Sequence, residues 1–270
     1  MYLASGKENY LGGLNFKNPL FFNGINFEAR GEIICADAIY DRSGGLKFPP
    51  PEIKKILNTI EFKTLCNDKN CMYSLLANFM PASIEIKNQD ELKTALQSFP
   101  AEKIAVLKPA NGLGGKGIFI DLPEILSEVN LEPGKNYVLQ QFINTSGGIK
   151  NIIPGKHDLR IIIIAGEIIM AHVRTPKEGH YLANVAQGGK IEELPLKKIP
   201  PKAMKMTREI QKIIDKKYGF PIYSIDFGFE KNRPYVFELN DTIGLPSEKM
   251  PSYKIFIQKL ILSLKEIAQK

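Results

Sequence analysis

Residues 224–241 read SIDFGFEKNRPYVFELND and predict two strands joined by a turn at 230–234. Asp226 lies in the middle of the first strand, and Glu238 and Asn240 lie on the second. Side chains two residues apart on a strand share a face, and the hairpin brings Asp226 beside them. Three oxygen-bearing side chains among apolar neighbours are costly to bury unless they bind something. Since magnesium prefers oxygen ligands, we predict a metal site here; the alternative is that Glu238 and Asn240 cap the hairpin's end.

A second informative stretch, IAVLKPANGLGGKGIFI at 104–120, is a glycine-rich loop between two apolar runs. Such loops cradle phosphate because their N–H groups can turn onto an anion. A Walker A loop needs Ser or Thr after its Gly-Lys pair, but Gly115-Lys116 is followed by Gly117. A dinucleotide-binding loop opens a helix, whereas IFIDLPE after Gly117 predicts a strand. A flap over a triphosphate, with Lys108 countering the phosphate charge, remains; the alternative is a tight turn beside a lysine that reaches out to solvent.

The composition is that of an ordinary globular protein, with 270 residues, 44% of them hydrophobic and 24% charged. No segment approaches the ~20 apolar residues of a membrane span. The first residues lack the charged stretch followed by an apolar stretch that is typical of a signal peptide. Three cysteines without metal-like spacing favour reduced thiols, so we expect a cytoplasmic protein without a membrane partner. The balance of 36 basic to 29 acidic residues gives +7. This net positive charge suits an anionic substrate. Because the lysines are scattered, we expect no nucleic-acid partner.

Strand and helix patterns alternate along the chain, which predicts an α/β or α+β fold with much antiparallel sheet. Residues 1–65 are rich in aromatic residues and glycine. Most of this stretch predicts short strands and loops, and PEIKKILNTIEF (51–62), near its end, predicts a helix. A polar cap followed by apolar residues predicts another helix over 67–79. We expect three parts: a short N-terminal domain (1–65), a central subdomain with the glycine flap (66–136), and a C-terminal subdomain with the metal site (137–270).

Several motifs occur in an order that resembles the ATP-grasp superfamily. They are LKPANGLGGKGIF (107–119), YVLQQFI (137–143), HDLRIIIIAGEIIMAHVRTPKEGHYLANVAQGG (157–189), IDFG (225–228) and FELN (237–240). The pattern is most similar to the branch of ribosomal-protein glutamate ligase and related amino-acid ligases, with glutathione synthetase further off. The resemblance covers roughly residues 65–245. It implies an α+β ATP-grasp fold, in which two α+β subdomains clamp ATP behind a short α/β N-terminal domain.

The resemblance also implies an ATP site built by both subdomains. The residues that would bind the nucleotide are Lys69, Lys108, Gly114, Gly115, Gly117, Gln141, Phe142, Ile143, Asp158, Arg160 and Asn184. The residues that would take part in catalysis are Arg174, Lys108 and Asn184. The ligands of Mg²⁺, for which Mn²⁺ could substitute, would be Asp226, Glu238 and Asn240, the same three residues that share a face of the hairpin.

The activity that the resemblance implies is an ATP-dependent carboxylate–amine ligase, which forms an amide bond through an acyl phosphate on an amino acid or peptide. Arg174 would contact the substrate and stabilise the transferring phosphoryl group and the tetrahedral intermediate; the alternative is a salt bridge to a carboxylate at a strand end. Arg42 is a candidate anchor for a substrate carboxylate, because a guanidinium pairs with it bidentately; an exposed loop fits Arg42 equally well. Two other functions stay open, an ATP-grasp kinase acting on a small molecule and a non-catalytic ATP-binding module. Substrate identity and homo-oligomer formation stay open too.

Overall fold

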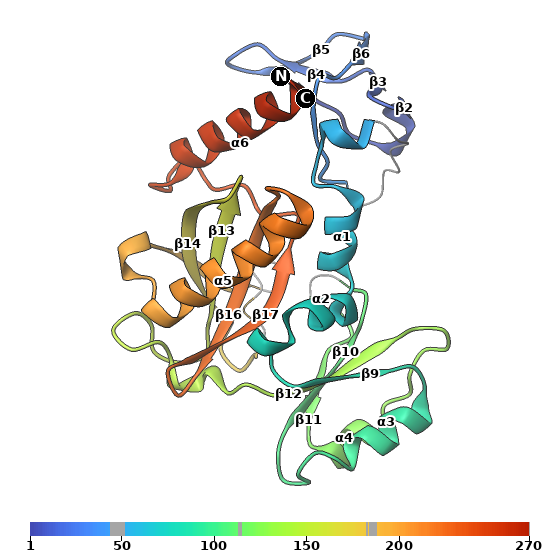
Figure 1. The fold of residues 1–270 in the computed structure, drawn as a ribbon, viewed down its shortest axis with the longest axis vertical. Helices are drawn as coiled ribbons and strands as arrows, with labels where there is room; N and C mark the ends of the chain where they lie inside the picture. Colours follow the sequence, from blue (N-terminus) through green and yellow to red (C-terminus); the bar gives the residue numbers. More distant parts are fainter. Residues whose placement is uncertain (44–51, 113–114, 182, 184–187, 270) are drawn as a thin grey trace.

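A computed structural model describes residues 1–43, 52–112, 115–181, 183 and 188–269 (Figure 1). In this view the N-terminal strands and the last helix lie at the top, a five-stranded sheet lies below them, and a four-stranded sheet lies at the bottom. Helices α1 and α2 run down one side of the molecule and connect these parts. Within the described ranges, no helix combines the length and the apolar character needed to cross a membrane.

The N-terminal segment forms short strands. One antiparallel sheet consists of β1 (Tyr2–Leu3), β4 (Leu20–Phe22) and β5 (Phe27–Ala29). A second antiparallel sheet consists of β2 (Tyr10–Gly12), β3 (Asn15–Lys17) and β6 (Ile33–Cys35). Strand β7 (Ile39–Tyr40) pairs in parallel with β8 (Ile56–Leu57). A 3-10 turn spans Lys7–Asn9. Up to Leu57, the described residues of this segment form strands and 3-10 turns, and the described part of the expected α/β domain (1–65) has no α-helix before Ile60. Gly12 and Gly24, with φ of 102° and 104°, interrupt the chain before a long element can form.

The predicted helix over 51–62 is wrong. A 3-10 turn (Glu52–Lys55) is followed by β8, and helix α1 begins only at Ile60. Tertiary contacts hold the intervening chain extended, because the buried Asn58 side chain donates to the Ile222 carbonyl at 2.6 Å and accepts from the Ile222 N–H at 2.7 Å. Thr59 then caps α1 by accepting a hydrogen bond from the Phe62 N–H.

Helices α1 (Ile60–Asn67) and α2 (Lys69–Leu76) are separated by the single residue Asp68. Its carboxylate accepts the N–H groups of Asn70 at 2.8 Å and Cys71 at 3.2 Å, a typical N-terminal cap. The predicted helix over 67–79 is confirmed as α2 and the 3-10 turn Ala77–Phe79 that follows it. The cap places Lys69 in the first turn of α2.

The four-stranded sheet carries the glycine loop. It consists of β9 (Ser83–Ile86), β10 (Ala105–Pro109), β11 (Phe119–Asp121) and β12 (Tyr137–Gln141), in the antiparallel order β11-β10-β12-β9. Helices α3 (Gln89–Leu96) and α4 (Pro123–Ser127) lie side by side against this sheet and share a core with it (Figure 1). The segment after the loop is a strand, as predicted, so the loop joins two strands of one hairpin.

The five-stranded sheet has the antiparallel order β15-β14-β13-β16-β17. Its strands are β13 (Asp158–Ile164), β14 (Glu167–Thr175), β15 (Lys190–Leu194), β16 (Ile222–Glu230) and β17 (Arg233–Asn240). Helix α5 (Pro201–Tyr218) shares the larger core with α1, α2 and one face of this sheet. Helix α6 (Tyr253–Ala268) shares a second core with alternate residues of the same strands, so it covers part of the opposite face. Two further 3-10 turns span Thr145–Gly147 and Leu196–Lys198.

Candidate active site

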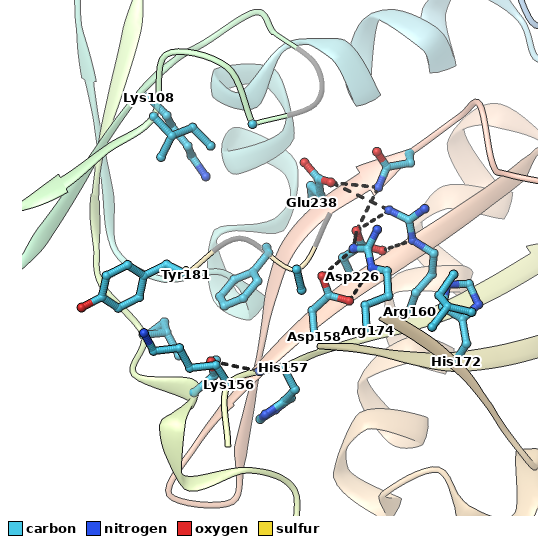
Figure 2. A pocket seen from close by; sticks show the side chains of 18 of the residues that line it. Lys108, Lys156, His157, Asp158, Arg160, His172, Arg174, Tyr181, Asp226 and Glu238 are labelled. Atoms are coloured by element: carbon cyan, nitrogen blue, oxygen red, sulfur yellow. Dashed lines mark hydrogen bonds and ion pairs between the residues drawn. The ribbon is translucent and has the colours of Figure 1, made fainter. Parts of the chain in front are cut away.

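Two arginine–aspartate pairs lie in the middle of the five-stranded sheet (Figure 2). Arg160 donates through Nε and Nη2 to Oδ1 and Oδ2 of Asp226, both at 2.6 Å. Arg174 pairs in the same way with Asp158, at 2.6 and 2.5 Å, and its Nη2 also donates to Asp226 Oδ2 at 2.6 Å. The strand register creates this contact, because Asp158 lies opposite Arg174, and Arg160 lies opposite Asp226. These four side chains form one ion-pair network.

The two aspartates of the ion-pair network bind protons with different strength. Burial alone would raise the pKa of Asp226, but Arg160 and Arg174 outweigh it and hold that pKa well below its ordinary value. Burial raises the pKa of Asp158 to about 7, although Arg174 opposes the shift. Asp226 is therefore the carboxylate that stays ionised, which is the state a metal ligand requires.

Asp226, Glu238 and Asn240 lie together on this face. Asp226 is opposite Glu238 in the hairpin, and Asn240 Nδ2 donates to Asp226 Oδ2 at 3.3 Å and to Glu238 Oε1 at 3.2 Å. Burial and, after it, the Asp226 charge raise the pKa of Glu238. Among the described residues, no group of three or more His, Cys, Asp or Glu side chains could hold a metal ion. The donor set here is two carboxylates and an amide, all of which offer oxygen, so its chemistry fits magnesium.

Two lysines face the ion-pair network from the other sheet and from α2. Lys69 Nζ donates to the carbonyl of Gly112 at 3.1 Å, and burial lowers the pKa of this lysine although Glu238 opposes the shift. Lys108 is buried on β10, where its Nζ donates to Gln140 Oε1 at 2.8 Å. Burial and then the neighbouring Lys69 charge lower the pKa of Lys108 to about 8. Sequence analysis missed Gln140 as the partner of Lys108, although a glutamine inside the apolar strand YVLQQFI is a signal that could have indicated it.

A cavity of about 660 Å³ joins all of these groups and lies between the two sheets, a size typical of ligand pockets. The predicted site residues that line it are Lys69, Lys108, Gly115, Gln141, Phe142, Ile143, Asp158, Arg160, Arg174, Asp226, Glu238 and Asn240. The structure therefore brings residues from 69 to 240 of the chain around one space. Their individual roles in binding and catalysis stay predictions.

Four predicted residues are not among those described as lining the cavity. Gly114 and Asn184 lie outside the described residues. Arg42 is exposed and stacks near the Tyr40 ring, with 5.6 Å between the guanidinium carbon and the ring centre. Gly117 has φ of 70°, and a Cβ there would lie 3.1 Å from a side-chain carbon of Pro109, so the turn in the flap requires glycine.

The end of the cavity near Phe142 holds a contact that sequence analysis did not predict. Lys156 Nζ lies 3.6 Å from the centre of the Tyr181 ring, and Tyr181 packs edge-on against Phe142 with 5.5 Å between ring centres. All three residues line the cavity. Because they come from three separate segments, no local pattern could have indicated the contact. It forms a wall of aromatic and cationic groups, which suits a planar base.

The fold places a cavity lined by lysines, arginines and carboxylates between two sheets, an arrangement that suits a nucleotide. Residues 70–227 match the model of the family described as "Prokaryotic glutathione synthetase, ATP-grasp domain". This match covers more than half of the chain, which therefore belongs to the ATP-grasp family. The expected ATP-grasp fold is confirmed.

Relatives of known annotation are similar to part of this chain. A probable alpha-L-glutamate ligase of Thioalkalivibrio sulfidiphilus is 26% identical over 160 residues, which are 58% of this chain and 47% of that protein. A glutathione synthetase of Synechococcus elongatus is 29% identical over 155 residues, which are 54% of this chain and 43% of that protein. The chain therefore matches less than half the length of these relatives.

Solved structures share the fold at low identity. D-alanyl-alanine synthetase A of Vibrio cholerae superposes with a TM-score of 0.61 at 13% identity, over 80% of this chain and 69% of that chain. Phosphoribosylamine–glycine ligase of Thermotoga maritima superposes with a TM-score of 0.58 at 15% identity, over 81% of this chain and 61% of that chain. These likenesses support the ATP-grasp fold alone.

Proposed function

We propose that this chain is an ATP-dependent carboxylate–amine ligase that acts on an amino acid or a peptide through an acyl phosphate. One observation carries the proposal: two lysines on one wall of a single cavity, neither with an acidic partner among the described residues, face two arginines, two aspartates, a glutamate and an asparagine on the other. A triphosphate between these walls would meet cations on one side and a magnesium-binding set on the other. The names of the relatives, glutamate ligase and glutathione synthetase, agree with this reaction class.

The nucleotide would bind with its base at the hinge and its phosphates toward the lysines. The hinge residues Gln141, Phe142 and Ile143 follow β12 directly, where main-chain groups can pair with the edge of adenine. Lys69 and Lys108 act as point charges on the phosphates. The glycine flap closes over them and excludes water, which protects an acyl phosphate from hydrolysis.

Asp226, Glu238 and Asn240 would hold the magnesium ion. When bound, the ion disperses the negative charge of the β- and γ-phosphates. Arg174 is fixed by Asp158 and Asp226, so its guanidinium needs no rearrangement when charge develops on the transferring phosphoryl group. The same guanidinium would then stabilise the tetrahedral intermediate that forms when the amine attacks.

Phosphate release tests this function, measured with ATP, Mg²⁺ and pools of amino acids and acidic peptides, with mass spectrometry of the products. A product heavier by a condensed residue supports the ligase, a phosphorylated product supports the kinase, and bound ATP without turnover supports the non-catalytic module. Glu238→Gln is expected to reduce turnover roughly a hundredfold or more, because charge stabilisation by a metal is worth several kcal/mol. Glu209→Gln, at an exposed position of α5, is the matched control. Equal turnover in the two variants would refute the metal assignment.

The location, the macromolecular partners and the oligomeric state of the protein are predicted from the sequence alone. A cytoplasmic location, the absence of a nucleic-acid partner, and the choice between monomer and homo-oligomer stay predictions.

A further inference from the structure

The cavity continues past the ion-pair network, and its chemistry changes there. Strand alternation places Ile162 on the same face of β13 as Arg160 and Met170 on the same face of β14 as Arg174. Ile162 lies opposite Met170, so an apolar row follows the charged rows along the sheet. Both residues line the cavity.

The loop between β17 and α6 completes this part of the lining. Leu245, Pro246 and Met250 line the cavity, and Met250 packs against the core that contains Ile162 and Met170. Leu245 is 56% exposed, so this apolar side chain borders the open space and is not part of the core. We refer to Ile162, Met170, Leu245, Pro246 and Met250 as the apolar end of the cavity.

Among the described residues that line the cavity, no cation without an acidic partner lies at the apolar end; Lys249 belongs to the same loop but is exposed and does not line the cavity. Arg160 and Arg174 are both held by aspartates. His172 lies at the boundary with its ring nitrogens buried and without a hydrogen-bond partner, and burial lowers its pKa to about 4, so the ring is neutral. The lysines of the lining, which come from α2, β10, the flap and the loop before β13, are Lys69, Lys108, Lys116 and Lys156. Figure 2 shows Lys108 and Lys156 on the other side of the ion-pair network from His172.

We propose that a substrate of the reaction is an amino acid or peptide residue with an uncharged apolar side chain, which packs against the apolar end. This inference rests on the proposed function and names its substrate class. Burying a leucine or methionine side chain is worth about 1.5–3 kcal/mol, or roughly 10- to 100-fold in affinity. A glutamate side chain would lose the hydration of its carboxylate there without gaining a cation. The chain would thus differ from those relatives that are named glutamate ligases.

Isothermal titration calorimetry tests the preference directly. The chain is saturated with Mg²⁺ and the non-hydrolysable analogue AMP-PNP and then titrated with L-leucine, L-methionine, L-glutamate and L-aspartate. Each is used as the free amino acid and in two dipeptides, one with alanine before it and one with alanine after it. We expect the leucine or methionine ligands to bind at least about tenfold more tightly than the acidic ones. Equal or tighter binding of the acidic ligands, or no binding of the apolar ones, overturns the proposal.

A charge placed at the apolar end gives a second test. Leu245→Arg is expected to weaken the binding of leucine and methionine ligands and to strengthen that of glutamate, since it supplies the missing cation. Leu262→Arg is the matched control, because Leu262 is 50% exposed on α6 and does not line the cavity. If both variants keep the preference of the unaltered chain, the apolar end does not select the substrate.

Phosphate release, measured with ATP in place of AMP-PNP and with the same ligands, separates the two proposals. Tighter binding of the apolar ligands without turnover of any combination of ligands would refute the ligase and leave the binding preference of the apolar end standing. Turnover with a preference for acidic ligands would refute the inference and leave the ligase standing.

Discussion

Lys63 lies buried between two carboxylates and connects three parts of the chain. Its Nζ lies 3.1 Å from Asp241 Oδ2, 3.4 Å from Asp41 Oδ2, and 2.9 Å from the Asp41 carbonyl oxygen, to which it donates. The side chains of Lys63, Asp41 and Asp241 are 6%, 3% and 9% exposed, so water does little to screen them. Asp241 directly follows Asn240, so the cluster fixes the end of β17 beside the proposed metal site.

We predict that Lys63→Met destabilises the protein by about 3–5 kcal/mol. Methionine keeps most of the apolar stem, so the loss comes from the two buried carboxylates that no longer have a cation between them. Removing one partner of a buried ion pair has this magnitude, because it leaves an uncompensated charge. An exposed pair of the same type would be worth at most about 1 kcal/mol.

Urea unfolding followed by circular dichroism and tyrosine fluorescence measures the effect, since the chain contains no tryptophan. Lys205→Met, at a lysine whose side chain is 81% exposed, is the control and should change the free energy of unfolding by less than about 0.5 kcal/mol. Adding Asp241→Asn to Lys63→Met should recover part of the loss, because one buried charge is then gone. A loss below about 1 kcal/mol for Lys63→Met, or no recovery in the double variant, would refute this account of the cluster.

Two further predictions concern pH. Burial and the Lys69 charge lower the pKa of Lys108 to about 8, so its ammonium group loses a proton and ATP affinity should fall as the pH rises from 7 to 9.5. In calorimetric titrations with AMP-PNP, Lys108→Arg should remove that fall, because arginine stays charged. A fall of equal size in the variant would exclude Lys108 as its source. Burial lowers the pKa of His172 from 6.5 to about 4, so the unfolded chain takes up this proton first and stability is lost as the pH falls through that interval. His172→Asn should lessen the loss between pH 7 and pH 4.5, measured by urea unfolding, by about 2 kcal/mol, and an unchanged loss would contradict the assignment.

The hairpin that holds the candidate metal site can be predicted from its own residues. Alternation in SIDFGFE and YVFELN defines which side chains share a face, and the turn between the two strands limits their register. The strand after the glycine loop can be predicted in the same way from the short apolar run that follows Gly117. Both predictions rest on contacts between residues close in sequence, which local patterns describe well.

The partners of the two arginines could not be predicted from local patterns. Arg174 lies opposite Asp158 because of the register between β13 and β14, which contains a bulge after Ile162. The helix predicted over 51–62 fails for a related reason. Asn58 binds main-chain groups of β16 and of the residue after β17, and these distant contacts override the local helical pattern.

The arginines of the ion-pair network are ordered before any substrate binds, and this order has an electrostatic consequence. A free arginine side chain carries about 2 kcal/mol of rotamer entropy, which the bidentate bonds to Asp158 and Asp226 remove in advance. The same bonds set the charge of Asp226, and part of that of Asp158, against the two guanidiniums, and Glu238 adds a further carboxylate to this wall of the cavity. Carboxylates on this wall repel the γ-phosphate, whereas the lysines that attract it lie on the opposite wall. A divalent cation bound by Asp226 and Glu238 would offset that repulsion, and this is one reason why we expect the proposed reaction to require magnesium.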